Sequence, residues 1–177
     1  EYSRRSMGGD VLTVDYRVAP EHTYPAALED AVAAYRWLVE EKHYAPKRII
    51  IAGDSAGGGL TLALALYLRD PRIPMPAGLI GMSPWTDLTC GGASHEMNFT
   101  KDPQFGNTKD NMLHDSAYIG EGDPTDPYLS PLFGSYEGFP PVLMQVGGDE
   151  VLLDDTLGVA EKLRAAGGKL RVSVYDG

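Results

Sequence analysis

The chain has 177 residues, 43% of them hydrophobic, which is enough to bury one core and is typical of a globular domain rather than a disordered one. Its 25 acidic and 15 basic residues give a net charge of −10, and no cluster of Lys and Arg could neutralise phosphates, so we expect no nucleic-acid partner. No apolar run approaches the roughly 20 residues that cross a bilayer. The opening residues lack the apolar stretch of a signal peptide and the single cysteine excludes an internal disulfide, so we expect a cytoplasmic protein.

Strand and helix signals alternate from the start of the chain. Residues 10–17, DVLTVDYR, alternate between apolar and polar side chains as a strand does. Pro25 can open a helix, and apolar residues then recur every three or four positions to about Tyr44. A second strand is predicted over residues 48–54, whose apolar run without alternation is typical of a parallel strand covered on both faces. The Ala- and Leu-rich residues 57–70 are predicted to form a buried helix.

The second half continues this alternation around one long irregular stretch. Residues 77–83 are predicted to form a third strand, and residues 84–108 show no regular pattern. A loop of that length in a compact domain is more often functional than idle. The remaining predicted elements are a short helix, a strand, a helix closed by glycines and a final strand, over residues 109–118, 141–148, 154–168 and 169–176.

These repeated strand–helix units predict an α/β fold. We expect one domain over residues 1–177, with a mostly parallel sheet, helices on both faces and right-handed crossovers. Ligands of such sheets bind where the strands end, at their carboxyl edge. The loops that begin at Val18, Asp54, Pro84 and Gly148 are therefore the candidate regions for a site.

The loop after the second strand carries a G-x-S-x-G pattern, formed by Gly53, Asp54, Ser55, Ala56 and Gly57. Its place between an apolar strand and an apolar helix is that of a nucleophile elbow. The turn is so sharp that we expect side chains at the two flanking glycines to collide with neighbours, and it lifts the Ser55 hydroxyl out of the sheet. The Ala56 N–H at the helix start can donate to a developing oxyanion. The alternative is a helix N-terminus that only packs closely or binds an anion.

A serine hydroxyl needs a base to take its proton and an acid to orient that base. In hydrolases with such an elbow, the acid follows the serine in the chain and the histidine follows the acid. Asp149 meets the first condition, because it lies in the loop that closes the predicted strand 141–148. Glu150 is a competing carboxylate, while Asp154 and Asp155 are expected to cap the next helix. The structural alternative for Asp149 is a turn-forming aspartate.

The histidine is harder to assign, because His22, His43, His95 and His114 all precede Asp149. We expect His43 and His114 to be solvated beside or on helices. His22 and His95 lie in loops and could approach the site.

A further polar side chain, the Cys90 thiol, lies in a glycine-rich loop. We interpret it as a small structural side chain, since no histidine is near it in the sequence. Trp85 and Phe99 in the same long loop either line a pocket or belong to the core.

The chain resembles the hormone-sensitive-lipase-like branch of the α/β-hydrolases, the bacterial esterases with a GDSAGG nucleophile motif. Four motifs occur in the right order over nearly the whole chain, at residues 14–38, 53–60, 83–89 and 126–155. The resemblance implies an α/β-hydrolase fold, with Ser55 as the nucleophile and Asp149 as the triad acid. It also implies a His-Gly-Gly-Gly oxyanion loop before Asp10, a catalytic histidine just after Gly177 and an N-terminal cap.

We therefore interpret the chain as an internal fragment of a longer gene product that lacks these elements. The 177 residues alone are expected to be nearly inactive, since loss of a triad histidine costs about a millionfold in subtilisin. The resemblance implies that the longer product hydrolyses carboxylic esters with short to medium acyl chains through an acyl-enzyme, without a metal or organic cofactor.

Other functions remain open for the same scaffold. Plant gibberellin receptors are similar to these esterases and bind a small molecule without cleaving an ester, and an amidase, lactonase or peptidase would share the acyl-transfer chemistry. The partner we expect is a small-molecule ester. The full-length protein could also form a homodimer through the edge strand predicted over residues 169–176.

Overall fold

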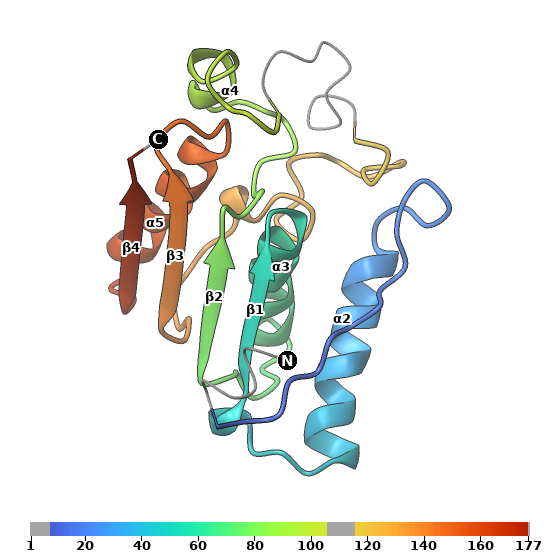
Figure 1. The fold of residues 1–177 in the computed structure, drawn as a ribbon. Helices are drawn as coiled ribbons and strands as arrows, with labels where there is room; N and C mark the ends of the chain where they lie inside the picture. The colour runs from blue at the N-terminus through green and yellow to red at the C-terminus, as the bar shows by residue number, and fades with distance from the viewer. Residues whose placement is uncertain (1–7, 106–115, 177) are drawn as a thin grey trace.

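The computed structural model describes residues 8–105 and 116–176, and within them four parallel strands form one sheet (Figure 1). The strands lie side by side in chain order, as β1 (Ile50–Asp54), β2 (Gly78–Met82), β3 (Val142–Gly147) and β4 (Leu170–Tyr175). Because every pair is parallel, all four strands end at the same edge of the sheet, the upper edge in Figure 1. The sequence predicted each of these strands to within two residues at either end.

The helices also follow the predicted periodicity, with differences at their ends. They are α2 (Ala26–Arg36), continued by a π-helical turn at Trp37–Glu41, then α3 (Ala56–Arg69), the single turn α4 (Ser94–Met97) and α5 (Leu153–Ala165), with 3-10 turns at Pro46–Arg48 and Pro131–Phe133. The helix predicted over residues 109–118 falls mainly outside the described residues, and residues 116–118 are not helical. No helix in the described ranges is long and apolar enough to cross a membrane.

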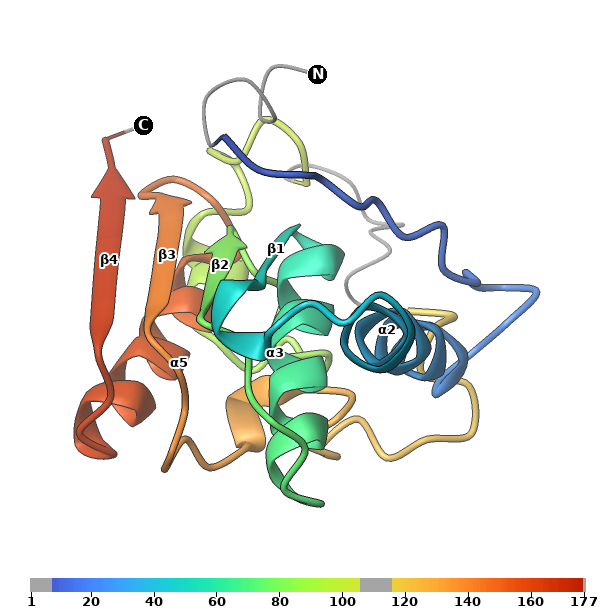
Figure 2. The same cartoon turned by 90° about the horizontal axis from the view of Figure 1, so that it is seen from below.

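The main core lies between the sheet and helices α3 and α5, which pack on the same face of it (Figure 2). Leu62 of α3, Leu79 of β2, Met144 of β3, and Val159 and Leu163 of α5 are buried in one cluster. Along β3, buried and half-buried residues alternate, so one face of the strand carries the core. Among the described residues, the expectation of a helix-covered parallel sheet is met on this face.

Helix α2 packs on α3 through a second apolar cluster. Leu28, Val32 and Tyr35 recur along α2 at helical spacing, and they contact Ala63 and Leu68 of α3. The periodicity that predicted this helix therefore marks the face that it buries.

The strand predicted over residues 10–17 is wrong, because these residues join no β-ladder and are drawn as a plain tube in Figure 1. The Arg17 guanidinium instead forms a two-pronged ion pair with Asp30 of α2, with N–O distances of 2.9 Å. The Tyr44 hydroxyl donates to Asp10 over 3.1 Å. Alternating side chains favour an extended chain, but a strand also needs a neighbour that exchanges backbone hydrogen bonds with it.

Strand β1 also differs from the expectation that both of its faces are covered. Ile50, Ala52 and Asp54 are exposed, whereas Ile51 and Gly53 between them are half-buried. Ile50 keeps 58% of its surface exposed. The apolar sequence of β1 therefore predicted more burial than the strand has, because the helices in the described residues cover only one face of the sheet.

Candidate active site

Ser55 occupies the turn between β1 and α3, at the edge where the strands end. Its backbone has φ 53° and ψ −118°, a conformation that residues other than glycine rarely adopt. Two neighbouring segments hold it there. The Ser55 N–H donates to the Met82 carbonyl of β2 over 2.8 Å, and the Ser55 carbonyl accepts from the Trp85 N–H over 3.0 Å. The serine is therefore fixed by its backbone, and the residue is half-buried.

The two glycines of the G-x-S-x-G pattern have different roles. A Cβ on Gly53 would lie 2.0 Å from the Gly57 carbonyl oxygen, so no larger residue fits there without moving the backbone. A Cβ on Gly57 would meet only the Tyr16 hydroxyl at 4.0 Å. The expected collision is thus present at Gly53, but it is wrong for Gly57, whose carbonyl rather than its α-carbon faces the strand.

The close approach occurs at the next two residues of α3, which are glycines that were not predicted to be constrained. A Cβ on Gly58 would lie 2.8 Å from the Pro84 Cβ, and a Cβ on Gly59 would lie 2.0 Å from the Trp85 carbonyl oxygen. The run of three glycines after Ala56 was the available signal. These glycines let the chain after β2 pass directly against α3.

The two remaining residues of the pattern lie at the same edge. Asp54 is the last residue of β1 and is exposed. Ala56 is the first residue of α3 and is exposed too. The N–H groups of the first helical turn have no acceptor within the helix, and they form the positive end of the helix dipole. The Ala56 N–H is thus suited to receive negative charge that develops beside Ser55.

Asp149 follows β3, in the turn formed by residues 148–151, which we call the acid turn. β1 and β3 are separated by β2 alone, so their ends are two strand spacings apart, about 10 Å. The Asp149 side chain is 45% exposed, and its Oδ1 lies 3.5 Å from the Nζ of Lys101. Ser55 and Asp149 therefore leave the same edge of the sheet on strands that are next-but-one neighbours (Figure 1).

Glu150, the competing carboxylate of the sequence analysis, is engaged within the turn. Its Oε1 accepts from the Ser83 hydroxyl over 2.9 Å and from the Gly147 N–H over 2.7 Å. Ser83 directly follows β2, so Glu150 links the ends of β2 and β3. This inward contact leaves Asp149 as the carboxylate of the turn that faces solvent.

Two buried polar residues of the long loop also bind the acid turn. The Asn98 side-chain amide donates to the carbonyls of Gly148 and Glu150, over 3.1 and 2.9 Å. The Asp102 carboxylate accepts from the Val151 N–H over 2.8 Å. Neither Asn98 nor Asp102 was predicted to contact the site, and the length of the loop that contains them was the available signal of a function.

A comparison with known proteins now identifies the family. Residues 4–177 match the model of a family described as having the alpha/beta hydrolase fold. The chain belongs to the α/β-hydrolase family. The predicted fold class is thereby confirmed.

Individual relatives and solved structures indicate the branch of the family to which the chain belongs. An acetyl-hydrolase of Streptomyces hygroscopicus is 44% identical over 162 residues, which are 92% of this chain and 54% of that protein. A crystal structure of an esterase from the bacterial hormone-sensitive lipase family is 44% identical with a TM-score of 0.91, over 97% of this chain and 57% of that one. The esterase EstE5, from a crystal soaked with p-nitrophenyl butyrate, is 44% identical with a TM-score of 0.85, over 92% and 54%.

The chain spans about half the length of the curated relatives it matches. These relatives confirm the resemblance stated from the motifs, so this α/β-hydrolase lies in the hormone-sensitive-lipase-like branch.

The α/β-hydrolase contains a buried ion pair beside the acid turn, between His95 and Asp155. The His95 Nε2 lies 3.0 Å from Asp155 Oδ1, and both side chains are almost fully buried. Asp155 Oδ2 accepts from the backbone N–H groups of Thr86 and Asp87, each over 2.7 Å. Both carboxylate oxygens thus accept N–H groups, which favours the ionised form of Asp155.

The expectation that Asp154 and Asp155 cap α5 is wrong, because the N-cap residue Leu152 makes no side-chain cap and the Asp154 N–H donates instead to the Ser94 hydroxyl over 3.0 Å. Asp155 binds the loop after β2, and Asp154 accepts from the Ser94 N–H over 2.8 Å. The physical reason is that the long loop folds back over the start of α5. The loop N–H groups reach the two carboxylates in place of the helix N–H groups.

The same pair engages one of the two histidines that could have approached Ser55. Burial lowers the pKa of His95, but the hydrogen bond to Asp155 and one to Cys90 outweigh burial and raise the pKa to about 10. Burial raises the pKa of Asp155, while His95 and the loop N–H groups oppose that rise. The raised pKa favours the imidazolium form of His95, which pairs with Asp155 and lies beside the half-buried Cys90. His95 lies only five residues after Cys90, so the interpretation that no histidine is near this thiol is wrong.

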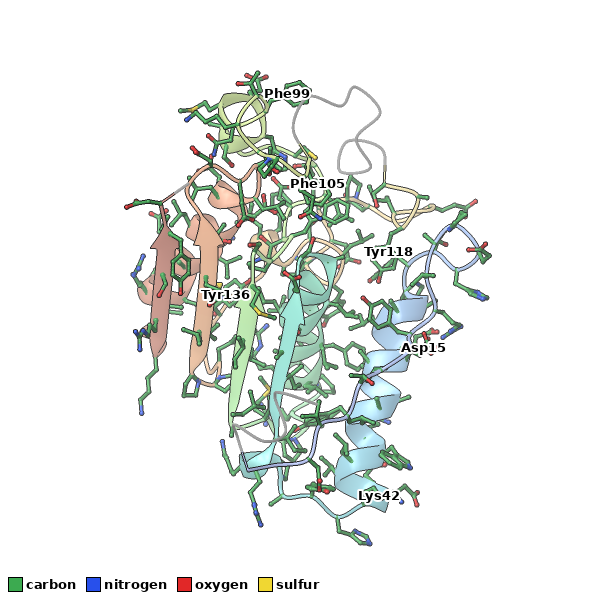
Figure 3. All side chains as sticks on the ribbon, viewed as in Figure 1. Asp15, Lys42, Phe99, Phe105, Tyr118 and Tyr136 are labelled. Atoms are coloured by element: carbon green, nitrogen blue, oxygen red, sulfur yellow. The ribbon has the colours of Figure 1, made fainter. Side chains whose placement is uncertain are left out.

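The other histidines lie elsewhere or outside the described residues. His22 is exposed, and its backbone N–H donates to the Val18 carbonyl. His43 is exposed and follows Lys42, which lies at the opposite end of the molecule from the carboxyl edge (Figure 3). His114 falls outside the described residues.

The two aromatic residues of the long loop differ. Trp85 is buried in a cluster with Leu88 and Leu129, so it belongs to the core. Phe99 is half-buried and lies beyond the carboxyl edge of the sheet (Figure 3).

Proposed function

We propose that this α/β-hydrolase cleaves small carboxylic esters with short to medium acyl chains, through an acyl-enzyme on Ser55. The observation that carries the proposal is the backbone of Ser55, held at φ 53° in the turn from β1 into α3. That turn lies at the edge where ligands of parallel sheets bind. The relatives support the substrate class, since one is named an acetyl-hydrolase and another was soaked with a butyrate ester.

In the proposed reaction, the Ser55 hydroxyl oxygen attacks the ester carbonyl carbon while a histidine takes its proton. The carbonyl electron pair moves onto oxygen, and the Ala56 N–H stabilises the resulting oxyanion. Collapse breaks the bond to the alcohol, which leaves with the proton of the imidazolium. Water, deprotonated by the same histidine, then releases the acid and restores Ser55. Every group in this scheme is a side chain or a backbone N–H, so it needs no metal or organic cofactor.

Asp149 would hold the tautomer of that histidine and stabilise its charged form. The two strand spacings between β1 and β3, about 10 Å, leave room for one imidazole between the residues that follow these strands. In the described ranges Asp149 contacts Lys101, and His95 is held by Asp155. The proposal therefore takes the catalytic imidazole from outside the described residues.

The test measures hydrolysis of p-nitrophenyl esters from acetate to decanoate by the protein as its gene encodes it. We expect Ser55→Ala to lower kcat by roughly 10⁴-fold or more, since removal of a triad serine costs about a millionfold in subtilisin. Ser135→Ala, at an exposed serine, is the matched control and should keep full activity.

Undiminished turnover in Ser55→Ala would contradict the proposal. Saturable binding of a non-cleavable ester analogue, with no turnover of any ester, would favour a binding protein. Faster cleavage of lactones or amides than of the esters would favour those activities on the same scaffold.

We also propose that the full-length protein is a cytoplasmic homodimer that pairs through β4 and binds no nucleic acid. β4 pairs with β3 alone in the described part of the sheet, and Val174 and Tyr175 near its end are exposed there. The net charge of −10 disfavours a polyanionic partner. Light scattering should give twice the mass of one chain, and a monomer at micromolar concentration would contradict the dimer.

A further inference from the structure

We infer that Asn98 is a positioning residue for the catalytic acid, because its side chain fixes the backbone on both sides of Asp149. This inference rests on the proposed function, in which Asp149 orients the catalytic histidine. Asn98 lies at the end of α4 in the loop after β2, about 50 residues before the acid turn.

The Asn98 amide bridges the carbonyl groups of the two residues on either side of Asp149. Its Nδ2 donates to the carbonyl of Gly148 over 3.1 Å and to the carbonyl of Glu150 over 2.9 Å. The residue is only 4% exposed, so water does not compete for these bonds. These two carbonyls, one before and one after Asp149, restrain the backbone of the acid turn on both sides of it. One NH₂ group therefore limits the directions in which the Asp149 side chain can leave the turn.

Asn98 is itself held in a rigid turn. Its own carbonyl accepts from the N–H groups of Lys101 and Asp102, each over 2.9 Å. The Asp102 carboxylate then accepts from the Val151 N–H with one oxygen and from the Gln104 N–H with the other. The segment 98–102 thus binds the acid turn as a unit with few free torsions, which is what precise placement requires.

The opposite side of the acid turn is fixed by Glu150, whose carboxylate accepts from Ser83 and from the Gly147 N–H. Backbone contacts therefore hold the turn from two sides. The Asp149 side chain, in contrast, has a weak described contact, a half-exposed pair with Lys101 at 3.5 Å. Exposed pairs of this kind contribute little, because water screens the charges. A rigid backbone with an easily displaced side-chain partner suits a carboxylate that must accept an imidazole N–H.

The first experiment compares Asn98→Ala with Met97→Ala, a control at the preceding residue, which is 71% exposed. Displacement of a catalytic group by about 1 Å can cost a hundredfold in rate. We expect Asn98→Ala to lower kcat by about 10- to 100-fold with KM within twofold, while Met97→Ala matches the unsubstituted protein. The acid limb of the kcat/KM profile should move to lower pH in Asn98→Ala, because a misplaced Asp149 stabilises the imidazolium less.

The second experiment separates positioning from stability with a double-substitution cycle. In the background of Asp149→Asn, where the carboxylate is absent, Asn98→Ala should lower kcat by less than threefold further. An equal loss in both backgrounds, or an unchanged kcat in Asn98→Ala, would overturn the inference. If Asn98→Ala does not fold, Asn98→Asp decides, since it keeps the shape of the side chain and removes both donors.

The outcomes also separate this inference from the proposed function. Full activity of Ser55→Ala would contradict the assignment of the nucleophile, and full activity of Asp149→Asn would contradict the assignment of the acid. Either result would contradict the proposed function. Activity lost in both of those variants but kept in Asn98→Ala would remove the positioning role alone.

Discussion

Ser55 carries a backbone strain that its neighbours compensate. A residue other than glycine at this positive φ costs about 1–3 kcal/mol. The hydrogen bonds to Met82 and from Trp85 maintain the conformation, and the absence of a side chain at Gly53 lets the Gly57 carbonyl approach the strand. Four other described non-glycine residues also have a positive φ, namely His43, Arg72, Ser83 and Cys90. Strain at a candidate nucleophile is nevertheless a pattern found at functional sites.

The strain predicts that Ser55→Gly gives a more stable protein than Ser55→Ala. Glycine adopts the positive φ of 53° without the clash that a Cβ makes there, so the free energy of unfolding should be higher by about 1 kcal/mol. Urea denaturation monitored by circular dichroism measures the difference. At Ser135, which has no positive φ, the order of the glycine and alanine variants should be reversed. The same order at both serines would mean that Ser55 is unstrained.

The buried His95 predicts that stability depends on pH in the alkaline range. The hydrogen bonds to Asp155 and Cys90 raise its pKa to about 10, against an ordinary value near 6.5. A group whose pKa is raised on folding stabilises fully below its unfolded pKa and loses that effect as the pH rises through its folded pKa. The free energy of unfolding should therefore fall between about pH 6.5 and pH 10.

Thermal unfolding in buffers from pH 6 to 10.5 tests this expectation. His95→Gln should flatten the dependence in that window, whereas His22→Gln, at an exposed position, should leave it unchanged. Equal slopes in the unsubstituted protein and in His95→Gln would show that His95 is neutral throughout.

At the scale of elements, α3 and the segment after β2 touch backbone to backbone at Gly59. A Cβ there would lie 2.0 Å from the Trp85 carbonyl oxygen, which cannot move without breaking the contacts around Ser55. We expect Gly59→Ala to lower the free energy of unfolding by about 3 kcal/mol, as overpacking of a close contact does. Gly57→Ala is the matched control in the same helix, since a Cβ there meets nothing closer than 4.0 Å.

Helix propensity predicts that Gly57→Ala is neutral or more stable by up to about 1 kcal/mol. Urea denaturation of both variants measures the difference. Similar stability of the Gly59 and Gly57 variants would contradict the close contact.

The elements themselves were largely predictable, because their signals are local. Apolar periodicity and punctuation by glycine and proline indicated α3, α5 and all four strands. Residues 10–17 show where this reasoning fails, since side-chain alternation does not reveal whether a partner strand is present. Asp155 shows the same limit for caps, because its N–H donors come from Thr86 and Asp87, almost 70 residues earlier.

For the candidate site, the sequence indicated the turn that carries Ser55 but not the contacts around the acid turn. Ser55 and Ala56 belong to one short motif, so the sequence alone indicated the elbow. Asn98 and the acid turn meet only because the loop after β2 folds across the end of β3, and neither residue type is unusual in a loop. Contacts of this kind between distant segments leave no periodic trace in the sequence.

At the scale of the whole molecule, the parallel sheet sets the geometry of the site. All four strands end at one edge, so residues about 90 positions apart in the chain, at Ser55 and in the acid turn, leave the sheet together (Figure 1). β2 lies between them, and its following residue Ser83 binds Glu150. The strand order thus couples the elbow and the acid turn through one intermediate strand.

The peptide groups that hold Ser55 have a consequence for sequence drift. The Met82 carbonyl and the Trp85 N–H are present whatever side chains those positions carry, so a substitution there can keep both hydrogen bonds to the serine. Gly53, Gly58 and Gly59, in contrast, have no room for a side chain. Divergence to 44% identity is therefore compatible with a TM-score of 0.91 to an esterase structure, because the scaffold is conserved by its main chain.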